Sequence, residues 1–256
     1  MNLTVLGGSA AGPNAGMGCA GFLVQHDQSS IVLDLGPDTL LELRKHVDVR
    51  DLGAIVISHY HLDHVLDLGA LRYLLAYGPA APSRKIDLLI PPGSLALFAL
   101  WGCAFGHDTD IGFWDDYFAI SEYDPKRGIK LPGLTISLAP TVHPAQGWAM
   151  RVTATSGEVL GYTADTGPAA ELAGHFRDLD LLIAEATDGT DEGSDDPLRG
   201  HLTALEAGQL AMEAGAKQLL LTHMWQENGF NQAIGRAAEA FSGSIMAAKP
   251  GLVITL

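Results

Sequence analysis

Four side chains able to bind a metal ion fall within six residues of this chain, directly after the apolar run 54–57. They are His59, His61, Asp63 and His64. Side chains of an extended strand alternate with a period of two, so His59 and His61 point the same way where the strand ends. When the chain then turns into a helix, Asp63 and His64 face a second position nearby. Nitrogen and oxygen ligands of this kind suit Zn, Mn or Fe. One short segment can therefore serve two metal ions, and the fold must bring the remaining ligands to it.

Three further residues stand at predicted strand ends. They are His143 after residues 134–139, Asp165 after residues 159–163, and His223 after residues 218–222. Loops at strand ends carry functional groups on a rigid scaffold, so we expect these residues to meet the histidine cluster at one edge of neighbouring sheets. An aspartate between two cations can bridge them, and a water shared by the cations loses a proton near neutral pH. Asp165 is our predicted bridge.

The rest of the chain alternates short β-runs with amphipathic helices. The predicted strands are residues 3–6, 21–26, 31–35, 54–58, 86–90, 117–123, 129–140, 149–154, 159–163, 181–184, 218–222 and 252–256. The predicted helices are residues 37–46, 62–77, 94–100, 169–176, 203–214 and 232–241. No Pro/Ser-rich linker or block of charge divides the sequence. We therefore predict one domain of mixed αβ layers over residues 1–256.

The amino-acid composition limits the kinds of partner that this chain is expected to bind. With 15 Lys+Arg against 30 Asp+Glu, the formal net charge is −15, which disfavours a protein that coats long nucleic acid. No apolar run is long enough to cross a membrane, so no membrane contact is expected. The sequence runs from Met1 directly into a strand-like segment without the pattern of a secretory signal, and Cys19 and Cys103 are too few for a disulfide framework. The expected location is the cytoplasm.

The ligand order His59-x-His61-x-Asp63-His64, His143, Asp165, His223 resembles the metallo-β-lactamase superfamily over nearly the whole chain. Two more motifs are similar to the branch that includes ribonuclease Z and related phosphodiesterases. Residues 161–166 (Gly-Tyr-Thr-Ala-Asp-Thr) resemble its Gly-Asp-Thr motif, with Ala164 in place of Gly. Residues 200–204 (Gly-His-Leu-Thr-Ala) resemble its Gly-His-Ser-Thr-Ala motif.

This resemblance implies an α/β (α+β) fold, the four-layer αββα sandwich of the metallo-β-lactamase type. It implies two divalent metal ions, with Zn favoured over Mn or Fe. One ion would be held by His59, His61 and His143, and the other by Asp63, His64 and His223. Asp63 would also orient or deprotonate the attacking water.

Three more residues receive roles from the resemblance. His201 matches an auxiliary histidine that stabilises charge on a phosphate or protonates the leaving oxygen. Asp34 and Glu185 match acidic positions that orient the ligands or this histidine, and metal-bound imidazoles do ordinarily donate their second N–H to such partners.

The spacing also bears on the substrate. Ribonuclease Z commonly carries a long tRNA-clasping arm between the third histidine and the bridging aspartate, but here His143 and Asp165 are only 22 residues apart. A predicted hairpin with its turn at residues 156–157 already uses that length. We therefore expect a small phosphodiester such as a cyclic nucleotide. Residues 200–223, especially residues 201–208, also resemble bacterial cyclic-nucleotide phosphodiesterases of this branch. A homodimer is expected from the resemblance alone.

Three alternatives stay open. The same metal centre can hydrolyse a carboxylic ester, lactone, thioester or β-lactam, or it can belong to a ribonuclease Z-like RNA endonuclease. A metal-stabilised binding module is the third, and it is disfavoured because a ligand set with an open water position is what catalysis needs.

Other conspicuous residues are less informative. We expect the aromatic-rich segment 101–118 to form a lid, a dimer face or part of the core. We expect Trp225 either to line the pocket and stack on a base or simply to pack in the loop after His223. The glycines of residues 7–21 predict a tight loop near the site rather than a dinucleotide site, because a strand follows them where a helix is required. The remaining histidines are expected to be structural or surface residues. They are His26, His46, His107 and His175.

Overall fold

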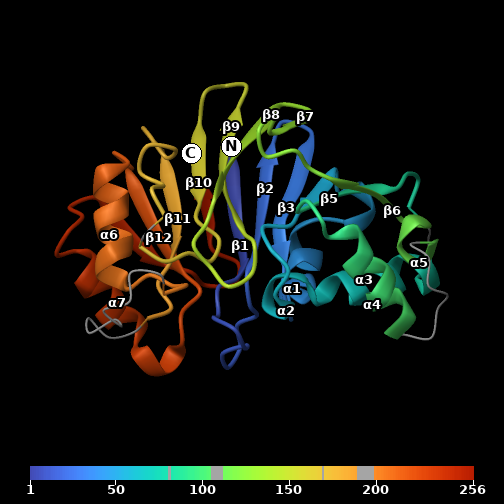
Figure 1. The fold of residues 1–256 in the computed structure, drawn as a ribbon, viewed down its shortest axis with the longest axis horizontal. Helices are drawn as coiled ribbons and strands as arrows, with labels where there is room; N and C mark the ends of the chain where they lie inside the picture. The colour runs from blue at the N-terminus through green and yellow to red at the C-terminus, as the bar shows by residue number, and fades with distance from the viewer. Residues whose placement is uncertain (80–81, 105–111, 169, 189–198) are drawn as a thin grey trace.

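Two mixed β-sheets pack face to face at the centre of the molecule, with helices on both outer sides (Figure 1). The computed structural model describes residues 1–79, 82–104, 112–168, 170–188 and 199–256. Within these residues each sheet has seven strands. His107 and Phe105 lie outside them, as does most of the acidic stretch 188–196.

The first sheet combines an antiparallel and a parallel half. Its order is β14 (Val253–Thr255), β1 (Asn2–Gly7), β2 (Gly21–His26), β3 (Ser29–Leu35), β4 (Ala54–Val56), β5 (Ile86–Ile90) and β6 (Phe118–Glu122). Pairing is antiparallel from β14 to β3 and parallel from β3 to β6.

The second sheet repeats this plan. Its order is β13 (Ser244–Ala247), β12 (Gln218–Thr222), β11 (Leu181–Glu185), β10 (Val159–Tyr162), β9 (Trp148–Ala154), β8 (Leu134–Pro140) and β7 (Ile129–Leu131). Pairing is antiparallel from β7 to β10 and parallel from β10 to β13.

Seven α-helices within the described residues flank the sheets. Those of the first half are α1 (Thr39–His46), α2 (Leu62–Val65), α3 (Asp67–Tyr77), α4 (Leu95–Ala104) and α5 (Gly112–Asp115), and those of the second half are α6 (Ala204–Glu213) and α7 (Phe230–Ala237). Short 3₁₀ turns follow α1 and β12, at η1 (Val49–Asp51) and η2 (Gln226–Asn228). Among the described residues, none of the helices combines the length and apolar character that crossing a membrane requires.

Three hydrophobic cores separate these four layers. One lies between the two sheets, one between the first sheet and its helices, and one between the second sheet and its helices. In β2, Phe22 and Val24 join the core between the sheets, whereas Leu23 joins the core under the helices. Strands buried on both faces are apolar at successive positions, which explains the continuous hydrophobic runs. The predicted αββα sandwich is confirmed.

The layers determine where the predicted ligands go. His59 follows β4, His143 follows β8, Asp165 follows β10 and His223 follows β12 directly. All four strands end at the same edge of the sandwich, so loops from both sheets converge there.

Several local predictions were wrong. The predicted helix 62–77 divides into α2 and α3 at Leu66, and the predicted strand 129–140 is the hairpin of β7 and β8, which turns at Gly133 with φ of 72°. The described residues of the predicted helix 169–176 form bends and turns instead. Strand β13 and helix α5 were not predicted. Within the segment 101–118, Phe113, Trp114 and Phe118 are buried in the core under the helices, so these three are core residues.

Gly36 gives a test of how tightly the first sheet holds the histidine segment. A Cβ at Gly36 would lie 1.8 Å from the backbone oxygen of Asp63. We expect Gly36→Ala to lower the free energy of unfolding by about 2 to 3 kcal/mol, because two backbone segments must separate. Chemical denaturation followed by circular dichroism measures this change.

Gly235→Ala is the matched control. Gly235 is an exposed residue of α7 with no atom within 4 Å of the added Cβ, so this change should be neutral or stabilising by about 0.5 to 1 kcal/mol. Equal stability of the two variants would contradict the close approach of Gly36 to Asp63.

Candidate metal centre

The structure brings all seven predicted metal ligands together at one edge of the sandwich. They form two groups in which the potential ligand atoms lie within 4.8 Å of one another. One group is His59, His61, His143 and Asp165, and the other is Asp63, His64, Asp165 and His223. Asp165 belongs to both groups, which is the position that a bridging carboxylate requires. Their service as ligands stays a prediction, and the geometry tests whether it is feasible.

The first group places imidazole nitrogens against one another. His61 Nδ1 is 3.3 Å from His59 Nε2 and 3.0 Å from His143 Nε2. A tetrahedral Zn²⁺ with Zn–N bonds of about 2.0 Å holds its nitrogen ligands about 3.3 Å apart. Burial lowers the pKa of His59 well below its ordinary value, which favours the neutral ring that binds metals. The three histidines therefore fit a metal ion.

The second group contains buried polar atoms that no protein group satisfies. His64 Nε2 and Asp165 Oδ1 have no hydrogen-bond partner, although they lie 3.3 Å apart. Asp63 Oδ2 is 2.9 Å from His223 Nε2 and 3.4 Å from His64 Nε2. Buried polar atoms without partners are costly, and a cation among them would satisfy them. This donor set also fits a metal ion.

The electrostatics of this corner keep its carboxylates ionised. Burial disfavours charge on Asp165, but the imidazoles of His223 and His64 hold the pKa of its carboxyl well below the usual range. Burial acts against Asp63 in the same way, and its hydrogen bonds to His223 and His64 lower the pKa of its carboxyl. Both aspartates are therefore anionic at neutral pH, which is the form that binds cations.

Asp34 accepts the hydrogen bonds that orient the second group from its buried side. Its Oδ2 accepts hydrogen bonds from His64 Nδ1 at 2.8 Å, Ser58 Oγ at 2.7 Å and the Tyr162 hydroxyl at 2.7 Å, while its Oδ1 accepts from the Ser58 N–H at 2.7 Å. A carboxylate that binds Nδ1–H leaves Nε2 of the same ring free for a metal. Asp34 has the left-handed φ of 56°, which aspartate tolerates better than most residues. The structure thus places it where an orienting residue belongs.

Two other imidazoles are oriented by neighbouring loops. His143 Nδ1 donates to the Gly200 carbonyl at 2.9 Å, so its Nε2 is the free nitrogen. His223 Nδ1 lies 2.7 Å from Thr187 Oγ1, and that hydroxyl donates to Glu185 Oε2 at 2.7 Å. Each ring therefore presents Nε2 to the cluster.

His201 stands beside the centre rather than within either group. Its Nδ1 lies 3.0 Å from Glu185 Oε1, and its ring centroid is 5.0 Å from that of His143 and 5.6 Å from that of His223. Partial burial opposes its charge, but the hydrogen bond to Glu185 raises the pKa of His201 to about 9. The Glu185 carboxylate is buried, whereas the His201 side chain is 30% exposed. The result is a cationic imidazole at the accessible side of the cluster.

Helix α6 fixes the segment that carries His201. Thr203 Oγ1 accepts from the Glu206 N–H, and the Glu206 carboxylate accepts from the Thr203 N–H at 2.8 Å, which is a capping box. Arg199 forms an ion pair with the same carboxylate. The segment 199–203 is therefore anchored at both ends around His201.

Sequence reasoning missed Thr187, Ser58, Tyr162 and the Gly200 carbonyl as partners of the cluster. Thr187 and Tyr162 each lie within two residues of the end of an apolar strand. A hydroxyl residue at such a position indicates a buried hydrogen bond only weakly, so the sequence offers little reason to single these residues out. The glycine-rich loop does lie close by, because Ala10 N and Asn14 Nδ2 both donate to the carbonyl of Met224, next to His223. Trp225 is half-buried beside Gly12, and its role stays a prediction.

The other described histidines lie outside both groups. His26 contacts Thr155, and His46 contacts Glu42.

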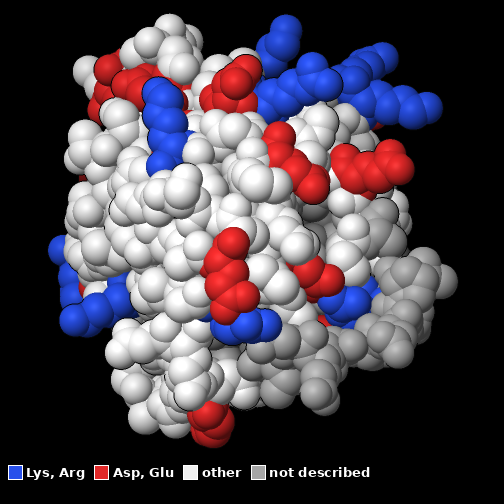
Figure 2. Space-filling model, turned by 90° about the vertical axis from the view of Figure 1, so that its left-hand side faces the viewer, with Lys and Arg blue, Asp and Glu red and all other residues white. Residues whose placement is uncertain are grey.

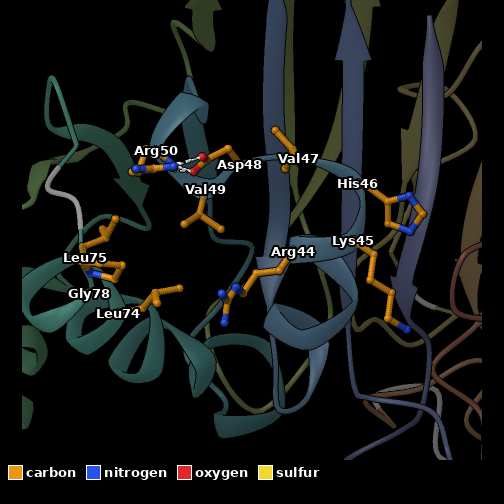
Figure 3. A pocket seen from close by; sticks show the side chains of 11 residues that line it. Arg44, Lys45, His46, Val47, Asp48, Val49, Arg50, Leu74, Leu75 and Gly78 are labelled. Carbon is orange, nitrogen blue, oxygen red and sulfur yellow. Dashed lines mark hydrogen bonds and ion pairs between the residues drawn. The ribbon is translucent and has the colours of Figure 1, made fainter.

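A pocket of about 490 Å³ lies between α1 and α3, and His46 is one of the residues that line it (Figure 3). The Arg44 side chain extends into this pocket, and Arg50 at its edge forms an ion pair with Asp48. None of the residues that line this pocket belongs to the metal-binding groups. It is therefore separate from the candidate centre.

Comparison with known proteins agrees with this geometry. A family model described as the Beta-lactamase superfamily domain matches residues 29–224. This chain belongs to the β-lactamase superfamily, in its metallo-hydrolase group. The protein named "Probable metallo-hydrolase YhfI" of Bacillus subtilis is 32% identical over 258 residues, covering 99% of this chain and 99% of YhfI. The crystal structure of YhfI matches with a TM-score of 0.85 at 28% identity, over 99% of this chain and 98% of YhfI.

Relatives within the superfamily include ribonucleases. A ribonuclease Z of Bradyrhizobium diazoefficiens is 30% identical over 293 residues, covering 96% of this chain and 97% of that protein. The short form of human tRNase Z shares the fold, with a TM-score of 0.75 at 21% identity, over 100% of this chain and 99% of that structure. The predicted superfamily and its ribonuclease Z-like branch are thus confirmed, and the chain is a metallo-hydrolase.

Asp34→Asn tests the orientation of His64. Asparagine keeps the shape and tolerates the positive φ, but it offers an amide where His64, Ser58 and Tyr162 donate. We expect zinc affinity to fall by roughly 10- to 100-fold, as is typical when an outer partner of a metal-bound histidine is lost. Titration of the metal-free protein against a chromophoric chelator measures the affinity.

Tyr162→Phe is the control for Asp34→Asn. It removes one of the four hydrogen bonds to Asp34 and leaves the carboxylate and the His64 contact in place. Its zinc affinity should change by less than that of Asp34→Asn. Unchanged affinity in Asp34→Asn would show that His64 needs no orienting carboxylate.

Proposed function

We propose that this chain is a phosphodiesterase that uses two divalent metal ions to hydrolyse a small phosphodiester such as a cyclic nucleotide. His59, His61 and His143 would hold one ion and Asp63, His64 and His223 the other, with Asp165 shared. Zn²⁺ is favoured by the five imidazoles, and Mn²⁺ or Fe²⁺ are alternatives. Bound metals would lower the pKa of a water molecule and neutralise the charge of phosphate oxygens.

The observation that carries the proposal is the His201–Glu185 pair. A cationic, partly exposed imidazole beside a metal-binding cluster is suited to a substrate that carries negative charge and leaves as an alkoxide. His201 would hold a non-bridging phosphate oxygen or donate its Nε2 proton to the leaving oxygen. Glu185 would keep that ring charged and correctly turned through the 3.0 Å contact to Nδ1. Asp63 would orient the attacking water and accept its proton.

Charge and chain length support a small substrate. The net charge of −15 repels a long phosphate backbone. Figure 2 shows the face that carries α6 and α7, where basic side chains gather at the upper right margin and acidic side chains lie next to them and elsewhere on the part drawn in full. The alignment with the ribonuclease Z of Bradyrhizobium spans 293 residues, more than the 256 of this chain, so that enzyme has segments without a counterpart here.

A ribonuclease Z-like RNA endonuclease is the second candidate, favoured by the 30% identity to that enzyme. A panel of substrates separates the candidates: a cyclic nucleotide, a tRNA precursor, bis-p-nitrophenyl phosphate, a lactone and a chromogenic β-lactam. The proposal expects turnover of the cyclic nucleotide and the aryl diester. Faster cleavage of the RNA would favour the second candidate, and turnover confined to the lactone or β-lactam would refute phosphodiester chemistry.

His201→Gln tests the role of the auxiliary histidine. The variant removes the charge and the acidic proton, so we expect kcat on the phosphodiester to fall by roughly 10² to 10⁴ while the metal content stays the same. His46→Gln is the control, because His46 lies outside the cluster, and its kcat should equal that of the parent. A His201→Gln protein with full metal content and full turnover would discard this role.

Metal counting tests the dinuclear part of the proposal. Elemental analysis of the purified protein should find two metal ions per chain. Removal of the His223 imidazole by His223→Ala should reduce this number to one, since His59, His61 and His143 do not depend on it. One ion per chain in the parent protein would establish a mononuclear centre instead.

A further inference from the structure

A pocket of about 420 Å³ on the outer side of the second sheet is lined by an unusual concentration of positive charge. Its lining contains four of the 15 Lys and Arg side chains of this chain and no aspartate or glutamate. These cations are Lys126, Arg127, Lys130 and Arg151, and we name the site the basic pocket. On a chain with 30 acidic residues, such a cluster creates a local field that attracts anions. None of the lining residues belongs to either metal-binding group.

Strand alternation builds the floor of the basic pocket. Along β8, Leu134, Ile136 and Leu138 enter the core between the sheets, so Thr135 and Ser137 face outward. Both of these polar residues are exposed. Helices α6 and α7 pack instead against β11, β12 and β13, at the other end of the same sheet (Figure 1). The outer side of β8 is therefore open to a ligand.

The register of the strands arranges the polar side chains of the floor in two rows. Thr135 is paired with Lys130 of β7 on one side and with Thr153 of β9 on the other, and Ser137 is paired with Arg151. Paired residues of neighbouring strands lie about 5 Å apart, and residues two apart along a strand lie about 7 Å apart. The two rows thus place one ammonium group, one guanidinium group and three hydroxyls on one small surface.

The charge of Arg151 is held in place without being neutralised. Its guanidinium donates to Thr153 Oγ1 at 2.9 Å and to the Arg177 carbonyl at 3.3 Å, and both acceptors are uncharged. His175 also lines the pocket, and burial together with the nearby charge of Arg151 lowers the pKa of its imidazole. Arg151 is therefore a fixed cation whose field reaches its neighbours.

The other cations of the basic pocket have little compensation. Within the part of the chain that the structure describes, the side chains of Lys126 and Lys130 form no hydrogen bond or ion pair. Arg127 pairs with Asp124 at 3.4 Å, but these side chains are 87% and 51% exposed, so the pair is weak. The pocket therefore keeps most of its positive charge for a ligand.

We propose that the basic pocket binds the phosphate groups of a small oligophosphate, such as inorganic pyrophosphate or a nucleoside diphosphate. A phosphate group presents several oxygen acceptors, which a guanidinium, an ammonium group and hydroxyls can satisfy together. The Thr153 hydroxyl accepts from Arg151, so its own hydrogen is available for a ligand oxygen. Two rows of donors about 7 Å apart favour a ligand with more than one phosphate group.

A small ligand fits the basic pocket better than a polynucleotide does. The volume of about 420 Å³ falls within the range of ordinary small-molecule sites, which is ~300 to 1,000 Å³. The cations are confined to β7, β9 and the turn before β7, whereas a nucleic-acid backbone needs cations along its length. Because the pocket contains none of the candidate metal ligands, it would hold its ligand without hydrolysing it, and the proposal does not depend on phosphodiesterase activity.

Isothermal titration calorimetry of the metal-loaded protein with inorganic pyrophosphate tests the proposal. Bound metal ions also attract phosphate, so we expect two classes of site in the parent protein. Arg151→Gln should weaken the class that belongs to the basic pocket by roughly 10- to 100-fold, because it removes a charged, doubly bonded donor. Lys126→Gln/Lys130→Gln should weaken the same class by roughly 10-fold, since its two cations are more exposed. Both variants should keep the metal content and the turnover of bis-p-nitrophenyl phosphate that the parent shows.

Lys217→Gln/Lys249→Gln is the matched control, because it removes the same charge from two exposed lysines outside the pocket. Its affinity for pyrophosphate should equal that of the parent. Hydrogen exchange locates the ligand in the parent, where bound pyrophosphate should slow the exchange of amides in residues 126–137.

Three results would overturn the proposal. The first is pyrophosphate affinity in the pocket variants equal to that of the parent. The second is protection from exchange that is confined to the loops of the candidate metal centre. The third is a single-stranded RNA that binds the parent more tightly than pyrophosphate does and loses that binding in Arg151→Gln, which would identify a nucleic-acid backbone as the ligand instead.

Discussion

The whole arrangement depends on gathering imidazoles and carboxylates into a corner from which water is largely excluded. Anions and unpartnered nitrogens in such a place are expensive unless a cation lies among them. Here Asp165 faces both groups: its Oδ2 is 3.4 Å from His223 Nε2 and 3.7 Å from His59 Nε2, while its Oδ1 faces His64. A bound metal ion would stabilise this costly corner, and for that reason the two sheets meet where the loops that carry the predicted ligands can share it.

Glu185 plays a comparable part for the loops of the second sheet. Its carboxylate accepts from the Thr166 N–H at 2.6 Å and from Thr187 Oγ1, and it also holds His201. Thr166 directly follows Asp165, and Thr187 contacts His223. One buried carboxylate at the end of β11 therefore links Asp165, His223 and His201, so that their positions are not independent.

Much of this site could be predicted from the sequence because its signals are local. Strand alternation places His59 and His61, and apolar runs that end at His143, Asp165 and His223 bring those residues to one edge. Other features depend on contacts between distant segments, which periodicity does not encode. The left-handed φ values of Asp34, Ala164 and His223 are examples, and the one at Ala164 is a conformation that glycine adopts without strain. The Leu66 break between α2 and α3 and the Gly133 turn escaped prediction because their apolar patterns continue through them.

The two sheets contribute unequal shares of the predicted ligands. The first sheet supplies residues 59–64, and the second supplies His143, Asp165 and His223. Ions bound at this seam would act as cross-links between segments some 80 to 160 residues apart, and such long closures remove much of the entropy of an unfolded chain. The metal ions would then stabilise the folded state as well as take part in catalysis. Opening the sandwich would require their release, so the lifetime of the folded state would be tied to the rate at which the ions dissociate.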